Sequence, residues 1–217
     1  MIEIRNTYVS GFEAAIRGMR NPKESWPKSD SHWTENPDCK APCNYVVGPH
    51  DLALMKNLVK AGNDHSKFMR MINVSCDIVA PVYWAQELDT YKVGTVRNSS
   101  SLMHRGMMHD YSIEDFSTNV DEDSNEAVDS AMCETWDSMV KVINSLVCMY
   151  RETHDEKYFF MARALMPMGY EYRFTWAANY QVLRNIYHAR KDHRLSEWHQ
   201  FCDWIKTLPY SELITDE

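Results

Sequence analysis

One run constrains the fold of this 217-residue chain more than any other, residues 80–105, A-P-V-Y-W-A-Q-E-L-D-T-Y-K-V-G-T-V-R-N-S-S-S-L-M-H-R. It begins with an apolar, aromatic stretch at Pro81, which predicts a short helix because proline is tolerated in a first helical turn. Residues 98–101, N-S-S-S, favour a loop, since such short polar side chains compete for backbone hydrogen bonds. Basic residues flank this loop on both sides: Lys92, Arg97, His104 and Arg105. The run is therefore either a helix followed by a polar loop or a pocket for a phosphorylated ligand.

The periodicity on either side of this run predicts an α+β fold in a single domain spanning residues 1–217. Strands are expected within Ile2–Val9, Phe68–Ile78 and Met168–Phe174. Helices are expected at Phe12–Met19, from Pro49 to Gly62, and at Glu126–Met149, Glu156–Leu165, Ala177–Ala189 and Leu195–Leu208. Asp51 lies where it can cap the second of these helices.

The segment from about residue 21 to 48 is rich in Pro, Ser, Asp and Lys and has no apolar period. We therefore expect a long loop, and loops of this length tend to be functional or mobile. Trp26 and Trp33 within it indicate that it folds onto another part of the protein.

Composition excludes several classes of function. The formal net charge of -8 argues against binding to polymeric nucleic acid, which needs a dense basic surface. No apolar run is long enough to span a bilayer and no secretory signal is visible, so a cytoplasmic protein without a membrane partner is expected. Of the six cysteines only Cys39 and Cys43 are close in sequence, and further ligands at finger-like spacing are lacking, so we expect no metal site.

The central run resembles the motif of the flavin-dependent thymidylate synthases, in which Ala-Pro and a short helix precede Arg-His-Arg-x-x-Ser-x-Asn-Glu-x-Ser-x-Arg-Tyr. With Ala80-Pro81 in register, residues 90–92, T-Y-K, fall on Arg-His-Arg. Of the later positions, Ser100 is identical, Thr95 is similar to the first Ser, and Asn98 stands in place of Glu. Lys92 keeps a cation at the third position of the triplet.

The C-terminal half carries a second part of the resemblance. The family has an Arg, then Leu-Pro, an aromatic strand, and a helix beginning Trp-x-x-Asn-x-Arg with Asn and Arg further along. The matching residues here are Arg163, Met166-Pro167, Trp176, Asn179, Gln181, Asn185 and Arg190. Gln181 replaces an arginine, and Asp64-His65 resembles the family's Glu-His. The resemblance spans about residues 51 to 205.

This resemblance implies a small, mainly antiparallel sheet surrounded by helices, in a homotetramer. It implies FAD as cofactor, dUMP as the small-molecule substrate, and methylenetetrahydrofolate and NADPH as co-substrates in transfer of a one-carbon unit to C5 of the base. Arg163 and Arg190 would be catalytic and, with Ser100 and Asn98, would bind the nucleotide. The residues that would face the flavin are His65, Lys92, Thr95, Asn179, Gln181 and Asn185.

Residue chemistry supports part of this assignment. A nucleotide phosphate calls for planar cations and short hydroxyl donors, which Arg163, Arg190 and Ser100 offer. We expect Asn179 and Asn185 to line one broad face of a helix. The alternatives are solvent-facing polar positions on that helix, a packing role for His65 and a surface role for Lys92.

The changed motif positions leave three functions open. The first is a flavin-dependent thymidylate synthase-like enzyme, and the second is a non-catalytic nucleotide-binding or scaffold protein on the same fold. The third is an enzyme that modifies a different pyrimidine nucleotide.

Overall fold

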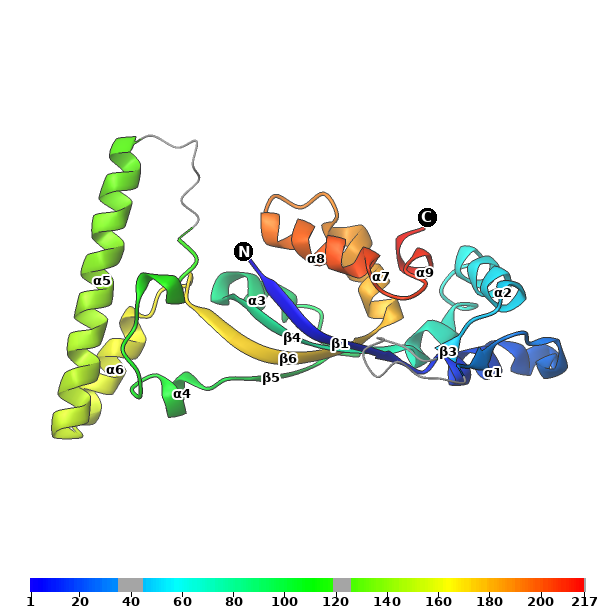
Figure 1. The fold of residues 1–217 in the computed structure, drawn as a ribbon, viewed down its shortest axis with the longest axis horizontal. Helices are drawn as coiled ribbons and strands as arrows, with labels where there is room; N and C mark the ends of the chain where they lie inside the picture. The colour runs from blue at the N-terminus through cyan, green and yellow to red at the C-terminus, as the bar shows by residue number, and fades with distance from the viewer. Residues whose placement is uncertain (35–44, 119–125, 217) are drawn as a thin grey trace. The chain divides into compact units, whose positions relative to one another are not determined.

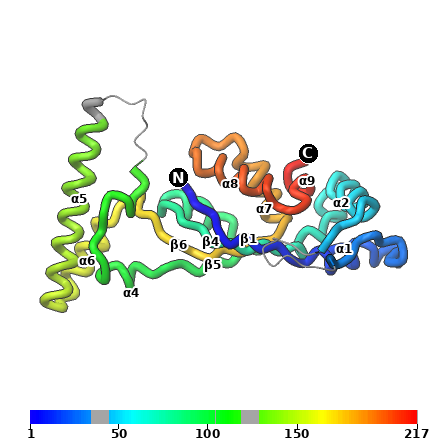
Figure 2. The backbone as a smooth tube through the Cα atoms, viewed as in Figure 1, coloured from blue at the N-terminus to red at the C-terminus, as the bar shows by residue number. Residues whose placement is uncertain are grey.

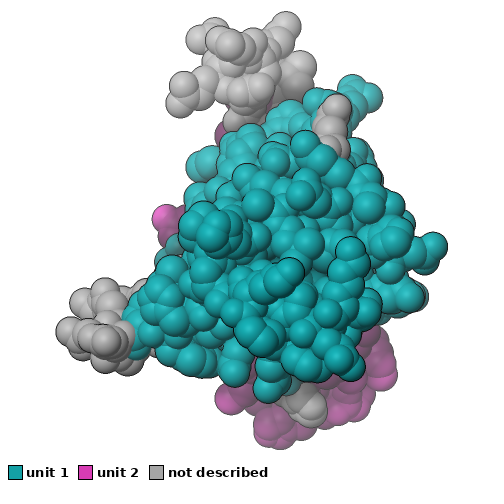
Figure 3. All heavy atoms as spheres, turned by 90° about the vertical axis from the view of Figure 1, so that its right-hand side faces the viewer, with its two compact units in different colours: residues 1–78, 89–98, 175–217 teal, residues 79–88, 99–174 magenta. Residues whose placement is uncertain are grey.

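The computed structural model describes residues 1–34, 45–118 and 126–216. These residues group into two compact units (Figure 3). Unit 1 comprises Met1–Ile78, Asp89–Asn98 and Thr175–Glu217, and unit 2 comprises Val79–Leu88 and Ser99–Phe174. The expectation of a single domain stays a prediction.

The main sheet has four strands in the order β1-β4-β6-β5. Their bounds are Glu3–Ser10 (β1), Asn73–Pro81 (β4), Val96–Ser99 (β5) and Glu171–Asn179 (β6). β4 and β6 run antiparallel, because Thr175 donates to Asp77 at 2.6 Å whereas Val82, just after β4, donates to Tyr170 at 3.0 Å. Every second residue of β4 from Val74 to Ala80 is buried, which is the alternation expected of a strand with one face on a core. The predicted α+β fold is confirmed.

Unit 1 packs its helices around an aromatic core. They are α1 (Phe12–Arg20), α2 (Pro49–Lys60), α7 (Tyr180–Arg190), α8 (Ser196–Lys206) and α9 (Glu212–Thr215), and α7, α8 and α9 gather together in Figure 1. Phe12 meets Tyr180 and Tyr210 edge to face, with ring centroids 5.7 and 5.2 Å apart. Trp198 contacts Phe201 at 5.8 Å. The contacts of Phe12 join the first helix to the last third of the chain.

Unit 2 contains α3 (Val82–Leu88), α4 (Leu102–Arg105), α5 (Glu126–Thr153) and α6 (Glu156–Leu165). α5 and α6 lie side by side in Figures 1 and 2. Their contact surface includes Ile143, Val147 and Phe159, which pack in one cluster with Tyr111 and Phe116. The sequence correctly predicts both helices, because their apolar residues recur at helical spacing.

The segment from residue 21 to 48 is more structured than one long loop. It contains two 3-10 turns, η1 (Asn21–Lys23) and η2 (Trp26–Lys28), and a short antiparallel pair of β2 (His32–Trp33) and β3 (Tyr45–Val46). A proline stands in the first turn of η1 and of η2, where the missing N–H costs no bond. Residues 35–44 lie outside the described part of the chain.

Several local predictions are wrong. Asn98 and Ser99 belong to β5 and are not in a loop. β6 continues to Asn179, so the helix predicted from Ala177 begins at Tyr180. Phe174, Trp176 and Ala178 alternate as buried residues, and pairing in the sheet decides their conformation over local propensity.

Another error concerns the start of α2. Asp51 is fully buried and is not the cap. Gly48 takes the N-cap position, and the Asp30 carboxylate accepts the backbone N–H groups of His50 at 2.8 Å and Asp51 at 3.0 Å. Although partial desolvation opposes it, these two hydrogen bonds lower the pKa of Asp30.

The described residues bear only in part on the expectations that the chain has no metal site and no membrane-spanning segment. Cys39 and Cys43 lie outside the described residues. Within the described ranges, His, Cys, Asp and Glu side chains form no group of three or more that could hold a metal ion. In the same ranges, the helices are all too short or too polar to cross a membrane.

Candidate functional site

The altered motif folds into a turn that is closed by its own side chains. The Thr95 hydroxyl donates to the carbonyl oxygen of Tyr91 at 2.7 Å, and Arg97 forms an ion pair with Asp89 at 2.8 Å. Lys92 is exposed in this turn. Thr95 and Arg97 therefore stabilise the turn itself, and Lys92 is exposed to solvent together with Val93.

Gly94 brings this turn against the start of α7. Its φ angle of +80° is strained for other residues, and an added Cβ would lie 3.0 Å from Nδ2 of Asn179. Asn179 is the N-cap of α7, because its Oδ1 accepts the N–H of Val182 at 3.1 Å. Asn179 thus precedes the helix, and the expectation that it shares a helix face with Asn185 is wrong.

Arg190, in the last turn of α7, lies between two aromatic side chains. Its Nε donates to the Tyr91 hydroxyl at 2.9 Å. Its guanidinium carbon lies 5.6 Å from the ring centroid of Tyr91 and 4.7 Å from that of Trp198, within the range of cation–π attraction. Tyr91, at the middle position of the motif, is therefore the partner of a predicted nucleotide-binding arginine. No sequence pattern links Tyr91 or Trp198 to Arg190.

Gln181 and Asn185 form a polar cluster with the segment that carries His65. Gln181 is buried, its Nε2 donates to Asn185 at 3.2 Å, and its Oε1 accepts from the Ser66 hydroxyl at 3.3 Å. The structure thus brings two predicted flavin residues to the neighbour of a third. Ser66 itself is missed by sequence reasoning, because a single serine after a helix carries no signal.

The predicted nucleotide residues are divided between the units. Ser100 follows β5 in unit 2, exposed, and its N–H donates to Arg173 at 2.8 Å, whereas Asn98 is exposed on β5 and counted in unit 1. Arg163 of α6 is exposed in unit 2 and Arg190 belongs to unit 1. Their convergence on one phosphate stays a prediction. The side chain of His104 lies outside what the structure describes.

Arg163 borders a very small pocket in unit 2. It hydrogen-bonds to the sulfur of Met103 and lines a space of about 10 Å³ with Leu102 and Met166. That volume holds about one water-sized sphere, so this pocket alone does not admit a nucleotide.

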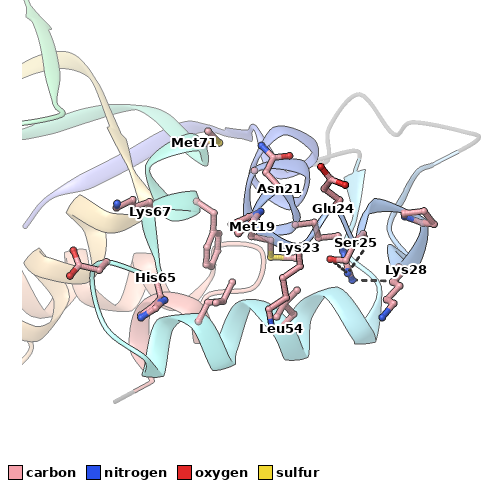
Figure 4. A pocket seen from close by; sticks show the side chains of 17 residues that line it. Met19, Asn21, Lys23, Glu24, Ser25, Lys28, Leu54, His65, Lys67 and Met71 are labelled. Carbon is pink, nitrogen blue, oxygen red and sulfur yellow. Dashed lines mark hydrogen bonds between the residues drawn. The ribbon is translucent and has the colours of Figure 1, made fainter.

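Unit 1 holds a much larger cleft of about 1140 Å³ (Figure 4). The end of α1, the turns η1 and η2, α2 and the 3-10 turn η3 (Lys67–Met71) form its walls. Its lining combines apolar residues with polar ones, and the members are Gly18, Met19, Arg20, Asn21, Pro22, Lys23, Glu24, Ser25, Pro27, Lys28, Leu54, Leu58, Asp64, His65, Lys67, Phe68 and Met71. Of the predicted site residues, His65 lies here. The other lining residues are missed, because they come from segments without a shared pattern.

Two solved structures resemble the chain over nearly its whole length. Thymidylate synthase X (ThyX) from Helicobacter pylori, with FAD and dUMP, has a TM-score of 0.67 at 17% sequence identity, covering 100% of this chain and 98% of that chain. Flavin-dependent thymidylate synthase ThyX from Helicobacter pylori, complexed with FAD and dUMP, has a TM-score of 0.66 at 17% identity, covering 99% and 98%. At this identity the likeness shows a shared fold.

Sequence comparison gives the family. No curated protein matches the chain. The family model described as "Thymidylate synthase complementing protein" (Thy1) matches residues 12–207, which is most of the chain. The altered turn, the α7 cluster and the cleft beside His65 all lie within this range, and the chain belongs to the thymidylate synthase complementing protein family.

Proposed function

We propose that this protein is a flavin-dependent thymidylate synthase-like enzyme that binds FAD and dUMP. Family membership over residues 12–207 supports this function, as does the fold shared with two proteins solved with FAD and dUMP. The observation that carries it is the cleft of about 1140 Å³ beside His65, since His65 stands at the family's Glu-His position and ligand pockets commonly measure about 300–1,000 Å³.

The donor set of the cleft suits a flavin nucleotide. A flavin needs apolar contacts for its ring system and polar groups for its edge and phosphates. Phe68, Leu54 and Leu58 offer the former, while His65 and three lysines offer the latter. In this proposal His65 contacts the flavin. Gln181 and Asn185 support the segment that carries His65, because Gln181 is hydrogen-bonded to both Ser66 and Asn185.

The proposed reaction is transfer of a one-carbon unit from methylenetetrahydrofolate to C5 of dUMP, with NADPH as reductant. When bound, reduced FAD supplies the reducing equivalents for methyl formation. The protein's own contribution is positioning and electrostatic stabilisation of the pyrimidine nucleotide, without an enzyme nucleophile. Arg163 and Arg190 are the proposed catalytic residues, and they bind the nucleotide with Ser100 and Asn98. Lys92, Thr95 and Asn179 complete the proposed flavin surroundings.

A second candidate is a nucleotide-binding protein without turnover, or an enzyme that acts on a different pyrimidine nucleotide. The bonding of Arg190 favours it, because Tyr91 and Trp198 already engage this guanidinium. The loss of two members of the basic triplet and of the arginine at Gln181 also favours it. Each arginine missing from a desolvated anion site costs about 2–5 kcal/mol of binding.

Ligand binding is the first test. The purified protein is expected to show a flavin absorption spectrum, either as isolated or after addition of FAD, and calorimetry with dUMP is expected to show binding. His65→Ala should weaken FAD binding, whereas His50→Ala, at an exposed histidine outside the cleft, should not. A colourless protein that binds neither FAD nor dUMP would exclude the flavin-dependent thymidylate synthase-like enzyme.

Turnover separates the candidates. The enzyme should support growth of a thymidine auxotroph without thymidine, and Arg163→Lys and Arg190→Lys should each abolish that growth. Retained ligand binding with no growth would favour the non-catalytic protein. The mass of the product formed from dUMP and from dCMP would identify a different modified base.

We further propose a homotetramer in which several chains build each active site. Exposed apolar side chains on α6 support an oligomer, since Phe160 is 61% and Met161 51% exposed. Light scattering should give the mass of four chains. A monomeric mass would contradict a shared active site.

A further inference from the structure

Unit 1 contains a buried ion pair that the proposed chemistry does not use. Nε of Arg20 donates to Oδ1 of Asp51 at 2.7 Å, and Nη2 of Arg20 lies 2.6 Å from the same oxygen. The side chain of Arg20 is 6% exposed and that of Asp51 is 0% exposed. Burial of two charges is costly and often contributes little net stability, so such a pair calls for another explanation.

Both members of this pair form hydrogen bonds with the same stretch of chain, residues 25–31. Arg20 donates through Nη1 to the carbonyl oxygen of Ser25 and through Nη2 to that of Lys28, both at 3.1 Å. Oδ2 of Asp51 accepts the hydroxyl groups of Ser29 at 2.6 Å and Ser31 at 2.7 Å. The pair therefore fixes residues 25–31 at several successive points.

Residues 25–28 of this stretch belong to one wall of the cleft. Ser25, Pro27 and Lys28 line the cleft, as do the preceding residues 21–24, which comprise η1 and Glu24. Two lysines, Lys23 and Lys28, stand on this wall, and Figure 4 shows Lys23 on the side of the turn that faces α2, with Glu24 on the other side.

The charge of the cleft contrasts with that of the whole chain. Besides Arg20, whose charge Asp51 balances, the lining carries Lys23, Lys28 and Lys67 against the carboxylates Glu24 and Asp64. The chain as a whole has a formal net charge of -8. Lysine ammonium groups beside an apolar floor suit a ligand that has a ring system and a phosphate.

We propose that Arg20 and Asp51 are positioning residues that hold Lys23 and Lys28 against the phosphate groups of the ligand. The cleft then selects a phosphorylated ligand over its neutral counterpart. For a flavin, which rests on the function proposed above, this means FAD and FMN in preference to riboflavin. The selectivity depends on the two lysines, and the lysines depend on the buried pair.

The test measures dissociation constants for FAD, FMN and riboflavin by flavin fluorescence. Lys23→Met/Lys28→Met should weaken FAD binding about tenfold or more and leave riboflavin binding nearly unchanged, because riboflavin has no phosphate. Lys60→Met is the matched control, since Lys60 is exposed on α2 outside the cleft. Lys23→Arg/Lys28→Arg should restore the preference. An unchanged ratio of FAD to riboflavin affinity in the double Met variant would overturn the proposal.

The positioning role has its own readout. Arg20→Lys keeps the charge but cannot reach both carbonyl groups and the carboxylate, so the ratio of FAD to riboflavin affinity should fall in the folded variant, as judged by circular dichroism. A fall in both affinities at an unchanged ratio would make Arg20 merely structural. Asp51→Asn provides a second variant if Arg20→Lys does not fold.

Binding of inorganic pyrophosphate, measured by calorimetry, separates this proposal from the proposed function. A protein that binds no flavin, but binds pyrophosphate in a way that Lys23→Met/Lys28→Met removes, would refute the flavin assignment and support the phosphate site. A protein that binds FAD equally with and without these lysines would refute the phosphate site alone. A protein that binds none of these probes would overturn both.

Discussion

Tyr91 and Arg190 show how a changed residue alters the surroundings of a predicted site residue. Tyr91 lies where the family motif has histidine, and both its hydroxyl and its ring engage Arg190. Trp198 covers Arg190 from α8 at 4.7 Å. The side chain that was expected to meet a phosphate is thereby held in one orientation by two aromatic rings.

Removal of the Tyr91 hydroxyl tests this bond. Tyr91→Phe keeps the ring but loses the acceptor for Nε of Arg190, and we expect a loss of about 0.5–1.5 kcal/mol in the free energy of unfolding, reduced by partial exposure. Urea denaturation measures it. Tyr187 lies on α7, the helix that carries Arg190, and its hydroxyl has no hydrogen bond among the described residues. Tyr187→Phe should therefore change the midpoint little. Equal midpoints for both variants would contradict the prediction.

The cysteines differ in burial, which predicts their reactivity. Burial raises the pKa of Cys76 to about 12 and that of Cys202 to about 11, so both thiols stay protonated and unreactive at neutral pH. Cys133 and Cys148 are exposed on α5, and the hydrogen bond to Glu152 raises the pKa of Cys148. Among these four cysteines of the described ranges, iodoacetamide should therefore label Cys133 first, then Cys148, and the buried pair only after unfolding. Mass spectrometry of the labelled peptides gives the order, and early labelling of Cys76 would refute it.

Element junctions depend on backbone conformation as much as on side chains. Gly11 joins β1 to α1 with φ +95°, and an added Cβ would lie 2.0 Å from the carbonyl oxygen of Met71. Gly62 follows α2 with φ +101°, and no heavy atom lies within 4 Å of an added Cβ. The two glycines share the strained φ and differ in the space around them.

This pair gives a matched test of the β1–α1 junction. Gly62→Ala should cost about 1–2 kcal/mol, the strain of a positive φ alone. Gly11→Ala should cost about 2–5 kcal/mol, because the backbone of Met71 must also move. Thermal unfolding of the two variants measures the difference. A Gly11→Ala variant as stable as Gly62→Ala would show that the backbone at Gly11 and the backbone at Met71 can move apart without cost.

The start of α2 gives a pH-dependent test. The folded-state pKa of Asp30 lies below the ordinary value of 3.8, so its stabilising contribution is present above that value and is lost as pH falls through the folded pKa. The wild-type melting temperature should exceed that of Asp30→Asn near pH 6, and the difference should shrink between about pH 4 and pH 2. Asp137→Asn, exposed on α5, should show little difference at either pH. A constant difference down to pH 2 would contradict the role of the charge.

At the scale of the whole molecule, the proposed functional residues belong to two different units. The large cleft, the altered turn and the α7 cluster belong to unit 1, whereas Ser100, Arg163 and the α5–α6 pair belong to unit 2. A ligand in the cleft should stabilise the folded protein, by about 2.7 kcal/mol at 100 times its dissociation constant.

Hydrogen exchange locates this stabilisation. Saturating FAD should slow exchange of amides in residues 18–28 and 62–71, which contain most of the cleft lining, more than in residues 140–153 of α5. Riboflavin provides the control, and it should protect residues 21–28 less than FAD does. Protection confined to α5 would place the flavin outside the cleft.

Much of the fold could be predicted from the sequence, because helix and strand periodicity is a local property. The helix Glu156–Leu165 begins and ends as predicted, and both ends of β1, α1, α5 and α8 lie no more than four residues from expectation. The errors at Asn98, Ala177 and Asp51 fall where pairing between distant segments overrides the local pattern.

By itself, the sequence determined the α+β class, most of the elements and the family, since these depend on local periodicity and on residue types at fixed spacing. Only the tertiary structure decided the partners of each candidate residue. Arg20 and Asp51 are 31 positions apart, Tyr91 and Arg190 are 99 apart, and Ser66 and Gln181 are 115 apart. Such pairs form because folding buries polar groups that then require hydrogen-bond partners, and the position of a partner along the chain follows from packing alone.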